Sequence, residues 1–154
     1  SIFYAADRYD ASFKLRKSLA EGKVVISNRY VSSNMGHQGA KIEDSASRRE
    51  LFDWLENLEY GIFKIPRPDL NLVLHVPVEI SSKLFRDRDR EDWKDKKGDI
   101  HQENLKHLEL AEKTYLELTQ IYDNFKLIEC VRDNQMLSEE VIAENVWEQV
   151  KTII

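Results

Sequence analysis

Arg29 is the first residue whose position favours chemistry. It follows a short apolar run, residues 23–27, with only Asn28 between them. If that run is a strand of a parallel sheet, Arg29 lies beyond its carboxyl end, where such sheets bind ligands. A guanidinium there can hold a phosphate or a carboxylate through two hydrogen bonds. A surface arginine paired with a neighbouring acid is the alternative, and position alone does not separate the two.

The segment that follows, residues 30–39, is unusually polar for chain leaving a strand. Asn34, His37 and Gln38 recur at helical spacing, with two glycines nearby. Amide, hydroxyl and imidazole groups together suit the polar edge of a ligand. A plain hydrophilic loop would not need this spacing, so the segment favours a short ligand-reading helix.

Residues 83–97 are the most highly charged stretch, with seven basic and five acidic side chains. Arg86, Arg88 and Arg90 alternate with acidic residues. A solvated helix face with self-paired charges is the more common meaning of such a run. The alternative is a mobile flap, hinged at Gly98, whose arginines close over phosphates.

Composition limits the class of protein. The chain has 154 residues, of which 42% are apolar and 33% charged, and its net charge is −5. These values fit one domain with a real core and argue against a disordered tail, a coiled-coil rod and a membrane protein. The negative charge argues against nonspecific nucleic-acid binding.

Cysteine and histidine usage narrows the chemistry further. The single cysteine, Cys130, excludes a disulfide framework and a cysteine-based zinc site, and it fits a reducing compartment. The four histidines are scattered, without a cysteine or acid at metal-ligand spacing, so a transition-metal site is not expected. His75 lies in an apolar run and is expected to be a hydrogen-bonded core residue.

The elements that must position these residues follow from hydrophobic patterning. Continuous apolarity and β-branched residues predict strands at residues 23–27, 70–76 and 125–131. Apolar residues at spacings of three and four predict helices over residues 13–19, 47–58, 105–122 and 138–150. This alternation predicts one three-layer α/β/α domain with a parallel sheet.

Capping residues predict where individual helices begin and end. Ser47 and Glu50 have the spacing of a capping box. Ser138 precedes two glutamates that suit the first turn of a helix. Gly22 is a suitable C-terminal stop for the first helix.

Four segments, in chain order, resemble the thymidylate kinase family of P-loop nucleoside monophosphate kinases. Residues 4–8 resemble the helix in which an aromatic residue and an arginine meet thymine. Residues 23–30 resemble the strand leading into an Asp-Arg-Tyr motif, and residues 33–39 the nucleotide-reading helix after it. Residues 83–102 resemble the lid. The second and third segments together are specific, and the similarity covers nearly the whole chain.

The resemblance implies a P-loop kinase fold over residues 1–154 with a mobile lid at about residues 83–99. It implies transfer of the γ-phosphoryl group of ATP to dTMP, giving dTDP, with Mg²⁺ as cofactor. A cytoplasmic homodimer is expected, with no nucleic-acid or membrane partner. Another P-loop nucleoside or nucleotide kinase, and a noncatalytic nucleotide-binding fragment, remain alternatives.

The resemblance also assigns roles by position on the dTMP side. The residues expected to contact dTMP are Tyr4, Arg8, Arg29, Asn34, His37 and Gln38. Tyr4 would stack on thymine and Arg8 would donate to its edge, because a flat ring and a multiple donor suit those tasks. Arg29 would hold the phosphate, and the remaining three would line the base and sugar.

Further roles concern phosphoryl transfer and ATP. The expected catalytic residues are Arg29, Arg86, Arg88 and Arg90, which would stabilise charge on the transferred group. The resemblance places Asp99 and Gln102 near the sugar. It places Asn28 near the Mg²⁺ ion and Arg132 near adenine.

Departures from the family pattern concern the metal and the phosphate cradle. Asn28 stands where aspartate is usual, and an amide brings no negative charge to Mg²⁺. Gln102 replaces a common glutamate, and Tyr4 a frequent phenylalanine. No G-x-x-x-x-G-K-S/T loop occurs. The expectation is therefore a chain whose P-loop segment lies upstream and which transfers little phosphate alone, with a P-loop-free paralogue as the alternative.

Overall fold

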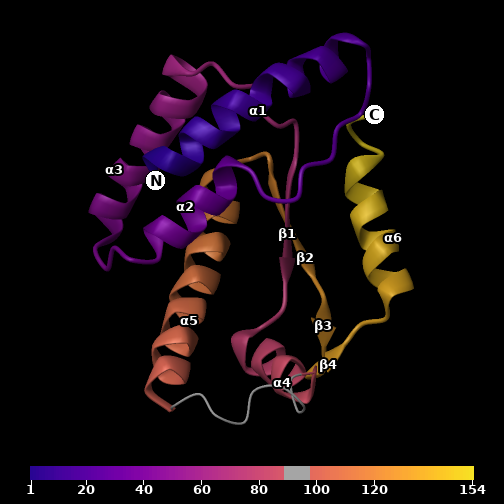
Figure 1. The fold of residues 1–154 in the computed structure, drawn as a ribbon. Helices are drawn as coiled ribbons and strands as arrows, with labels where there is room; N and C mark the ends of the chain where they lie inside the picture. The colour runs from indigo at the N-terminus through magenta and orange to yellow at the C-terminus, as the bar shows by residue number, and fades with distance from the viewer. Residues whose placement is uncertain (89–97) are drawn as a thin grey trace. The chain divides into compact units, whose positions relative to one another are not determined.

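The computed structural model describes the backbone of residues 1–88 and 98–154, and the side chains of residues 1–84 and 105–154 (Figure 1). These residues form two compact units. Unit 1 comprises Ser1–Asp69 together with Ile154, and unit 2 comprises Leu70–Ile153.

The regular elements of unit 1 are all helices. Its elements are α1 (Ile2–Ala20), α2 (Val31–Gly39), α3 (Ser45–Glu56) and a π-helical segment, η1 (Asn57–Ile62), that continues α3. Helix α2 packs beside α3, and α1 contacts η1 (Figure 1). The buried apolar side chains of these elements are Ala5, Val31, Met35, Phe52 and Leu55.

The ends of the helices in unit 1 follow local chemistry. Gly22 adopts a φ of 73°, and the amides of Gly22 and Lys23 bond back to the carbonyls of Leu19 and Ser18. That left-handed C-terminal motif confirms the predicted glycine stop. The predicted start of α3 is wrong: its N-cap is Asp44, whose carboxylate accepts from the amide of Ser47 at 2.7 Å. Ser47 therefore lies inside the helix.

The strand predicted at residues 23–27 is also wrong. The segment is non-regular chain, and Val24 and Ile26 are 69% and 92% exposed. The two sheets within the described ranges form without it. A strand exists only where its amides and carbonyls meet a neighbouring strand, so an apolar run without such a neighbour stays irregular.

Unit 2 contains the parallel strands. β1 (Asn71–His75) pairs with β2 (Phe125–Glu129), in register from Asn71↔Phe125 to His75↔Glu129. Both strands and their parallel pairing confirm the prediction from continuous apolarity. The register brings the carboxyl ends of the strands together at His75 and Glu129, which is where a parallel sheet offers a site.

Helices join and flank this strand pair. α4 (Val78–Arg88) follows β1, α5 (Gly98–Ile121) precedes β2, and α6 (Glu139–Val150) closes the unit. In Figure 1, α5 and α6 flank the strands, and each contacts β2. Ser138 Oγ accepts from the amide of Val141 at 3.4 Å, which confirms the predicted start of α6. None of the helices within the described ranges is both long and apolar enough to cross a membrane.

A tight hairpin connects β2 to α6. It consists of β3 (Val131–Arg132) and β4 (Gln135–Met136). The two linking residues, Asp133 and Asn134, have φ values of 52° and 60°. A two-residue loop with positive φ at both positions is a type I′ turn, and aspartate and asparagine tolerate that backbone. The hairpin therefore fixes the position of Arg132, on β3, relative to the end of β2.

Candidate functional site

A strained turn presents Arg29 to solvent. Its φ is 70°, in the left-handed region that an arginine rarely adopts. Ser27 Oγ donates to the Arg29 carbonyl at 2.7 Å, and Arg29 Nη2 lies 3.4 Å from His37 Nε2. Such strain persists where surrounding contacts fix the residue, and it is frequent at ligand-binding sites. The structure thus brings together two predicted site residues, Arg29 and His37.

Tyr30 anchors that turn. Its hydroxyl donates to the carbonyl of Pro66 at 2.9 Å. Burial, and then the Glu59 carboxylate, raise the pKa of Tyr30 to about 12, so the hydroxyl keeps its proton. The anchor holds one end of the turn while the neighbouring Arg29 side chain stays exposed.

A buried ion pair lies between α1 and η1. Arg8 donates through Nε and Nη2 to the two oxygens of Glu59, at 2.6 and 2.7 Å. The Glu59 side chain is fully buried, and that of Arg8 is 15% exposed. A bidentate arginine–carboxylate pair is among the strongest polar contacts in a protein. Glu59 is therefore a central residue of unit 1, although its position next to the predicted helix end gave no indication of this.

Asn34 completes this network from α2. Its Nδ2 donates to Glu59 Oε1 at 3.4 Å and to the Ser1 carbonyl at 3.2 Å. Its Oδ1 is buried and has no hydrogen-bond partner among the described residues. A buried acceptor without a donor costs free energy unless a ligand or water supplies one. The amide oxygen of Asn34 is thus available to a donor from outside the chain.

The other predicted residues of unit 1 are more open. Tyr4 lies one turn before Arg8 on α1, on the same helix face, and is 61% exposed. Gln38 is half-buried and accepts from Lys41 Nζ at 3.1 Å. Asn28 is exposed beside Arg29. The two arginines among the predicted site residues of unit 1 are therefore in contrasting states: Arg8 is ion-paired, and Arg29 is exposed.

A polar cluster occupies the carboxyl ends of the parallel strands in unit 2. His75 Nδ1 lies 2.7 Å from Glu129 Oε2, and His75 Nε2 lies 2.8 Å from Glu112 Oε1. The predicted hydrogen bonding of His75 is thus confirmed, although its side chain is 15% exposed. Cys130 is buried, and burial raises the pKa of its thiol, as suits a core residue.

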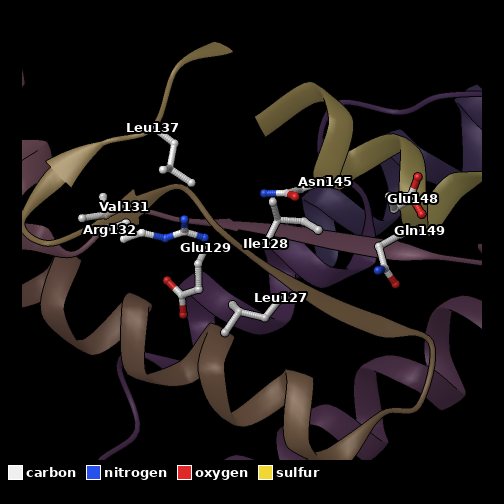
Figure 2. Close-up of a pocket in the computed structure, with 9 residues that line it drawn as sticks. All are labelled: Leu127, Ile128, Glu129, Val131, Arg132, Leu137, Asn145, Glu148 and Gln149. Carbon is white, nitrogen blue, oxygen red and sulfur yellow. The ribbon is translucent and has the colours of Figure 1, made fainter. Parts of the chain in front are cut away.

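Arg132 lines a cavity of about 260 Å³ between β2, the β3–β4 hairpin and α6 (Figure 2). Its residues combine apolar and polar side chains, namely Leu127, Ile128, Glu129, Val131, Arg132, Leu137, Asn145, Glu148 and Gln149. More than half of these side chains are polar, so the cavity offers hydrogen-bonding groups beside a few apolar side chains.

A second, wider cavity of about 550 Å³ lies between α4 and the same hairpin. Its lining includes Pro77, Ile80 and Lys83 from one side and Asn134 and Met136 from the other. The hairpin therefore borders each of these two cavities, and Lys83 brings a positive charge from the base of the predicted lid.

Several predicted residues fall outside what the structure describes. Arg90 lies outside the described residues altogether, and Arg86, Arg88, Asp99 and Gln102 lie where only the backbone is described. The roles of these five residues and the lid itself remain predictions.

The described side chains do not assemble a metal site. No group of three histidine, cysteine, aspartate or glutamate residues that could hold an ion occurs among them. Asn28 offers only a neutral amide oxygen, whereas Mg²⁺ in proteins takes one or two carboxylates together with substrate phosphates.

A model of one protein family, described as thymidylate kinase, matches residues 1–141. The chain belongs to the thymidylate kinase family. Membership confirms the resemblance and implies a P-loop kinase α/β fold, with which the parallel β1–β2 pair is consistent.

Curated relatives agree with the family assignment. A probable thymidylate kinase of Thermococcus kodakarensis is 30% identical over 144 residues, which cover 93% of this chain and 62% of the relative. The thymidylate kinase of Mycobacterium tuberculosis is 28% identical over 92 residues, covering 60% and 42%. That of Shewanella loihica is 25% identical over 142 residues, covering 92% and 61%. The chain thus spans about six-tenths of the length of the Thermococcus and Shewanella relatives.

Proposed function

We propose that the full-length protein transfers the γ-phosphoryl group of ATP to dTMP, giving dTDP. The observation that carries this proposal is the strained Arg29 turn, which aims an open guanidinium beside His37 in a chain of the thymidylate kinase family. An exposed guanidinium in a strained turn keeps its charge and its donors available to a phosphate.

Unit 1 would bind dTMP. Arg29 holds the phosphate, and Tyr4, exposed on α1, stacks on thymine. The buried Oδ1 of Asn34 supports contact with the base, because thymine carries an N–H that can donate to it. Arg8 donates to the base edge while Glu59 fixes its orientation. His37 and Gln38, half-buried on α2, line the base and sugar.

Unit 2 and the lid would serve ATP and the transferred group. Adenine is placed beside Arg132, because the mainly polar cavity there offers hydrogen-bonding groups and a few apolar side chains to a ring with ring nitrogens and an amino group. The proposed catalytic groups are Arg29 and the lid arginines Arg86, Arg88 and Arg90, with Asp99 and Gln102 near the sugar. Their charges would stabilise the phosphoryl group in transit.

Mg²⁺ is proposed to accompany ATP, because phosphate oxygens supply most of the ligands that this ion needs. Asn28 lies near the proposed phosphate site, but its amide adds no charge. The protein is further proposed to be a cytoplasmic homodimer. Its proposed fold is one three-layer α/β/α domain with a mobile lid at about residues 83–99.

The test is an acceptor assay with the full-length protein, ATP and Mg²⁺. Formation of ADP and dTDP should depend on dTMP and be much slower with the monophosphates of uridine or adenosine. Faster turnover of another nucleotide would instead establish a different nucleotide kinase. Nucleotide binding without turnover of any acceptor would establish a noncatalytic protein.

A further inference from the structure

His75 is held by two carboxylates on two different elements. It is the last residue of β1, and Glu129 lies directly opposite at the end of β2. Nδ1 lies 2.7 Å from Glu129 Oε2, and Nε2 lies 2.8 Å from Glu112 Oε1 on α5. The imidazole therefore bridges the strand pair and the helix that covers it.

These distances fix the protonation that the cluster needs. Carboxylate oxygens only accept hydrogen bonds, and a neutral imidazole donates from only one nitrogen. Both contacts are hydrogen bonds only if both ring nitrogens carry protons. Burial, the largest single effect, lowers the pKa of His75, but the hydrogen bonds with Glu112 and then Glu129 together outweigh it, and the pKa is raised above 6.5.

Glu112 contacts the start of α4 as well as His75. While Oε1 meets His75, Oε2 accepts from the backbone amide of Val78 at 3.2 Å. Val78 is the first residue of α4 and is buried. The first amides of a helix have no partner within it, and a negative charge there is also favoured by the helix dipole. One carboxylate thus ties the imidazole to the start of the helix that leads into the predicted lid.

We propose that His75 is a positioning residue: as an imidazolium it orients Glu112, and Glu112 in turn fixes the first turn of α4. The functional part of this role rests on the proposed kinase activity, because α4 carries the lid arginines Arg86 and Arg88. The structural part rests only on the cluster itself.

Among the described side chains, Glu129 and Glu112 are the charged groups shown within hydrogen-bond distance of His75, and Arg132 lines a cavity together with Glu129. On β2 the facing group is Glu129, and the other charged residue of that strand, Lys126, is opposite Leu72. On α5 the facing group is Glu112, and on α4 the nearest charged residue in the chain is Glu79. The cluster therefore holds one titratable cation between two acids.

The sign of the pH dependence follows from the raised pKa. The orientation is complete below about pH 6.5, the ordinary histidine pKa. It is lost as the pH rises through the higher value in the folded protein, because one carboxylate then faces a nitrogen that cannot donate.

Glu112→Gln and Glu129→Gln form a matched pair for the test. Both remove a carboxylate at nearly the same distance from His75, but only Glu112 touches Val78. In the full-length protein, NMR titration should place the His75 pKa above 6.5 and show it lowered in both variants. Exchange of the Val78 amide, corrected for intrinsic pH dependence, should accelerate about tenfold or more in Glu112→Gln, as expected for loss of a charge-assisted hydrogen bond. It should change much less in Glu129→Gln.

Activity supplies the readout that a merely structural role would not move. In the wild type, kcat for dTMP should fall as the pH rises through the His75 pKa, with KM for dTMP little changed. This decrease of kcat with rising pH should be missing in His75→Gln, whose side chain does not titrate. If kcat of this variant decreases with pH as in the wild type, His75 does not position the lid.

A His75 pKa at or below 6.5, or equal Val78 exchange in the two glutamine variants, would overturn the cluster's structural role. Both measurements use the wild type or the two glutamine variants, and neither requires catalytic turnover. Failure to phosphorylate dTMP would therefore refute the proposed kinase without deciding the role of His75.

Discussion

In both units a carboxylate joins separate elements by accepting hydrogen bonds from a cationic side chain, but the cation differs. In unit 1, Glu59 accepts two hydrogen bonds from Arg8 and thereby joins η1 to α1. In unit 2, Glu112 accepts from His75 and Val78 and thereby joins α5 to β1 and to the start of α4. Each is a partly or fully buried carboxylate that joins separate elements: Glu59 accepts from Arg8 and Asn34, and Glu112 accepts from His75 and Val78.

The difference lies in when the cation is charged. Arginine keeps its charge throughout the pH range in which an imidazole titrates, and the Arg8–Glu59 contact is permanent in that sense. An imidazole is charged only below its pKa, so the His75 cluster is conditional. The permanent contact includes Arg8 of the proposed dTMP site. The conditional contact lies at the start of the helix leading to the predicted lid.

The largest effect should come from breaking the permanent contact. Glu59→Gln leaves the Arg8 charge without its carboxylate and should destabilise the fold by about 3–5 kcal/mol, measured by denaturant unfolding. The control is Glu56→Gln, three residues earlier, which also faces an arginine, Arg67, at 3.2 Å. Because the Arg67 side chain is 60% exposed, this pair should contribute only about 0–1 kcal/mol. If the two variants lose the same free energy of unfolding, the buried Arg8–Glu59 pair does not stabilise unit 1 more than an exposed pair does.

The next effect distinguishes Arg29 from Arg8, the other arginine of the proposed dTMP site. Arg29→Ala should leave stability nearly unchanged, because Arg29 is exposed, but should weaken dTMP binding by one to two decades. Loss of a charge-assisted contact costs about 1.5–3 kcal/mol. KM and kcat for dTMP in the full-length protein provide the measurement. Arg49→Ala, on the exposed face of α3, is the control and should leave both constants unchanged. Wild-type kinetics in Arg29→Ala would refute the phosphate role.

A smaller effect should expose the conditional contact in unit 2. Because the pKa of His75 is raised in the folded chain, its contribution to stability is complete below about pH 6.5. The wild type should then exceed His75→Gln in melting temperature under mildly acidic conditions, and the gap should narrow as the pH rises. The corresponding gap between wild type and Glu59→Gln should not narrow. A gap for His75→Gln that widens with pH would mean that the imidazole is neutral.

The sequence predicted the parts of the fold that depend on neighbouring residues. β1 and β2 could be predicted as parallel strands because both are continuous apolar runs in an alternating chain. Gly22 and Ser138 could be assigned because helix capping involves residues a few positions apart. The resemblance rested likewise on compact local motifs, such as residues 28–30, and the family assignment confirms it.

What failed or was missed depends on distant partners. Residues 23–27 have the composition of a strand, but a strand also needs a neighbour, which local composition does not encode. Glu59 and Glu112 lie 51 and 37 residues from the cations that they bind, so their importance emerges only from the folded chain. Asp44 was missed for another reason: it and Ser47 are both good caps, and the backbone decides between them.

The smallest effect concerns those caps. The Asp44 carboxylate accepts from the Ser47 amide at 2.7 Å, and this hydrogen bond lowers the pKa of Asp44, whereas the Ser138 hydroxyl accepts from Val141 at 3.4 Å. Asp44→Ala should lower the melting temperature by roughly 2–4 °C, and Ser138→Ala by less, since the Ser138 hydrogen bond is longer and uncharged.

The Asp44 cap should also depend on pH. Its contribution to stability is present above the ordinary aspartate pKa and should vanish as the pH falls through the lowered pKa of Asp44. Asp44→Asn keeps a cap oxygen without the charge, so it should retain most of the stability and lose this acid dependence. An equal loss in Asp44→Ala and Ser138→Ala would show that the charge adds nothing to the cap. If the stability contribution of Asp44 is lost on the acid side and that of His75 on the alkaline side, these two contacts give unit 1 and unit 2 opposite responses to pH.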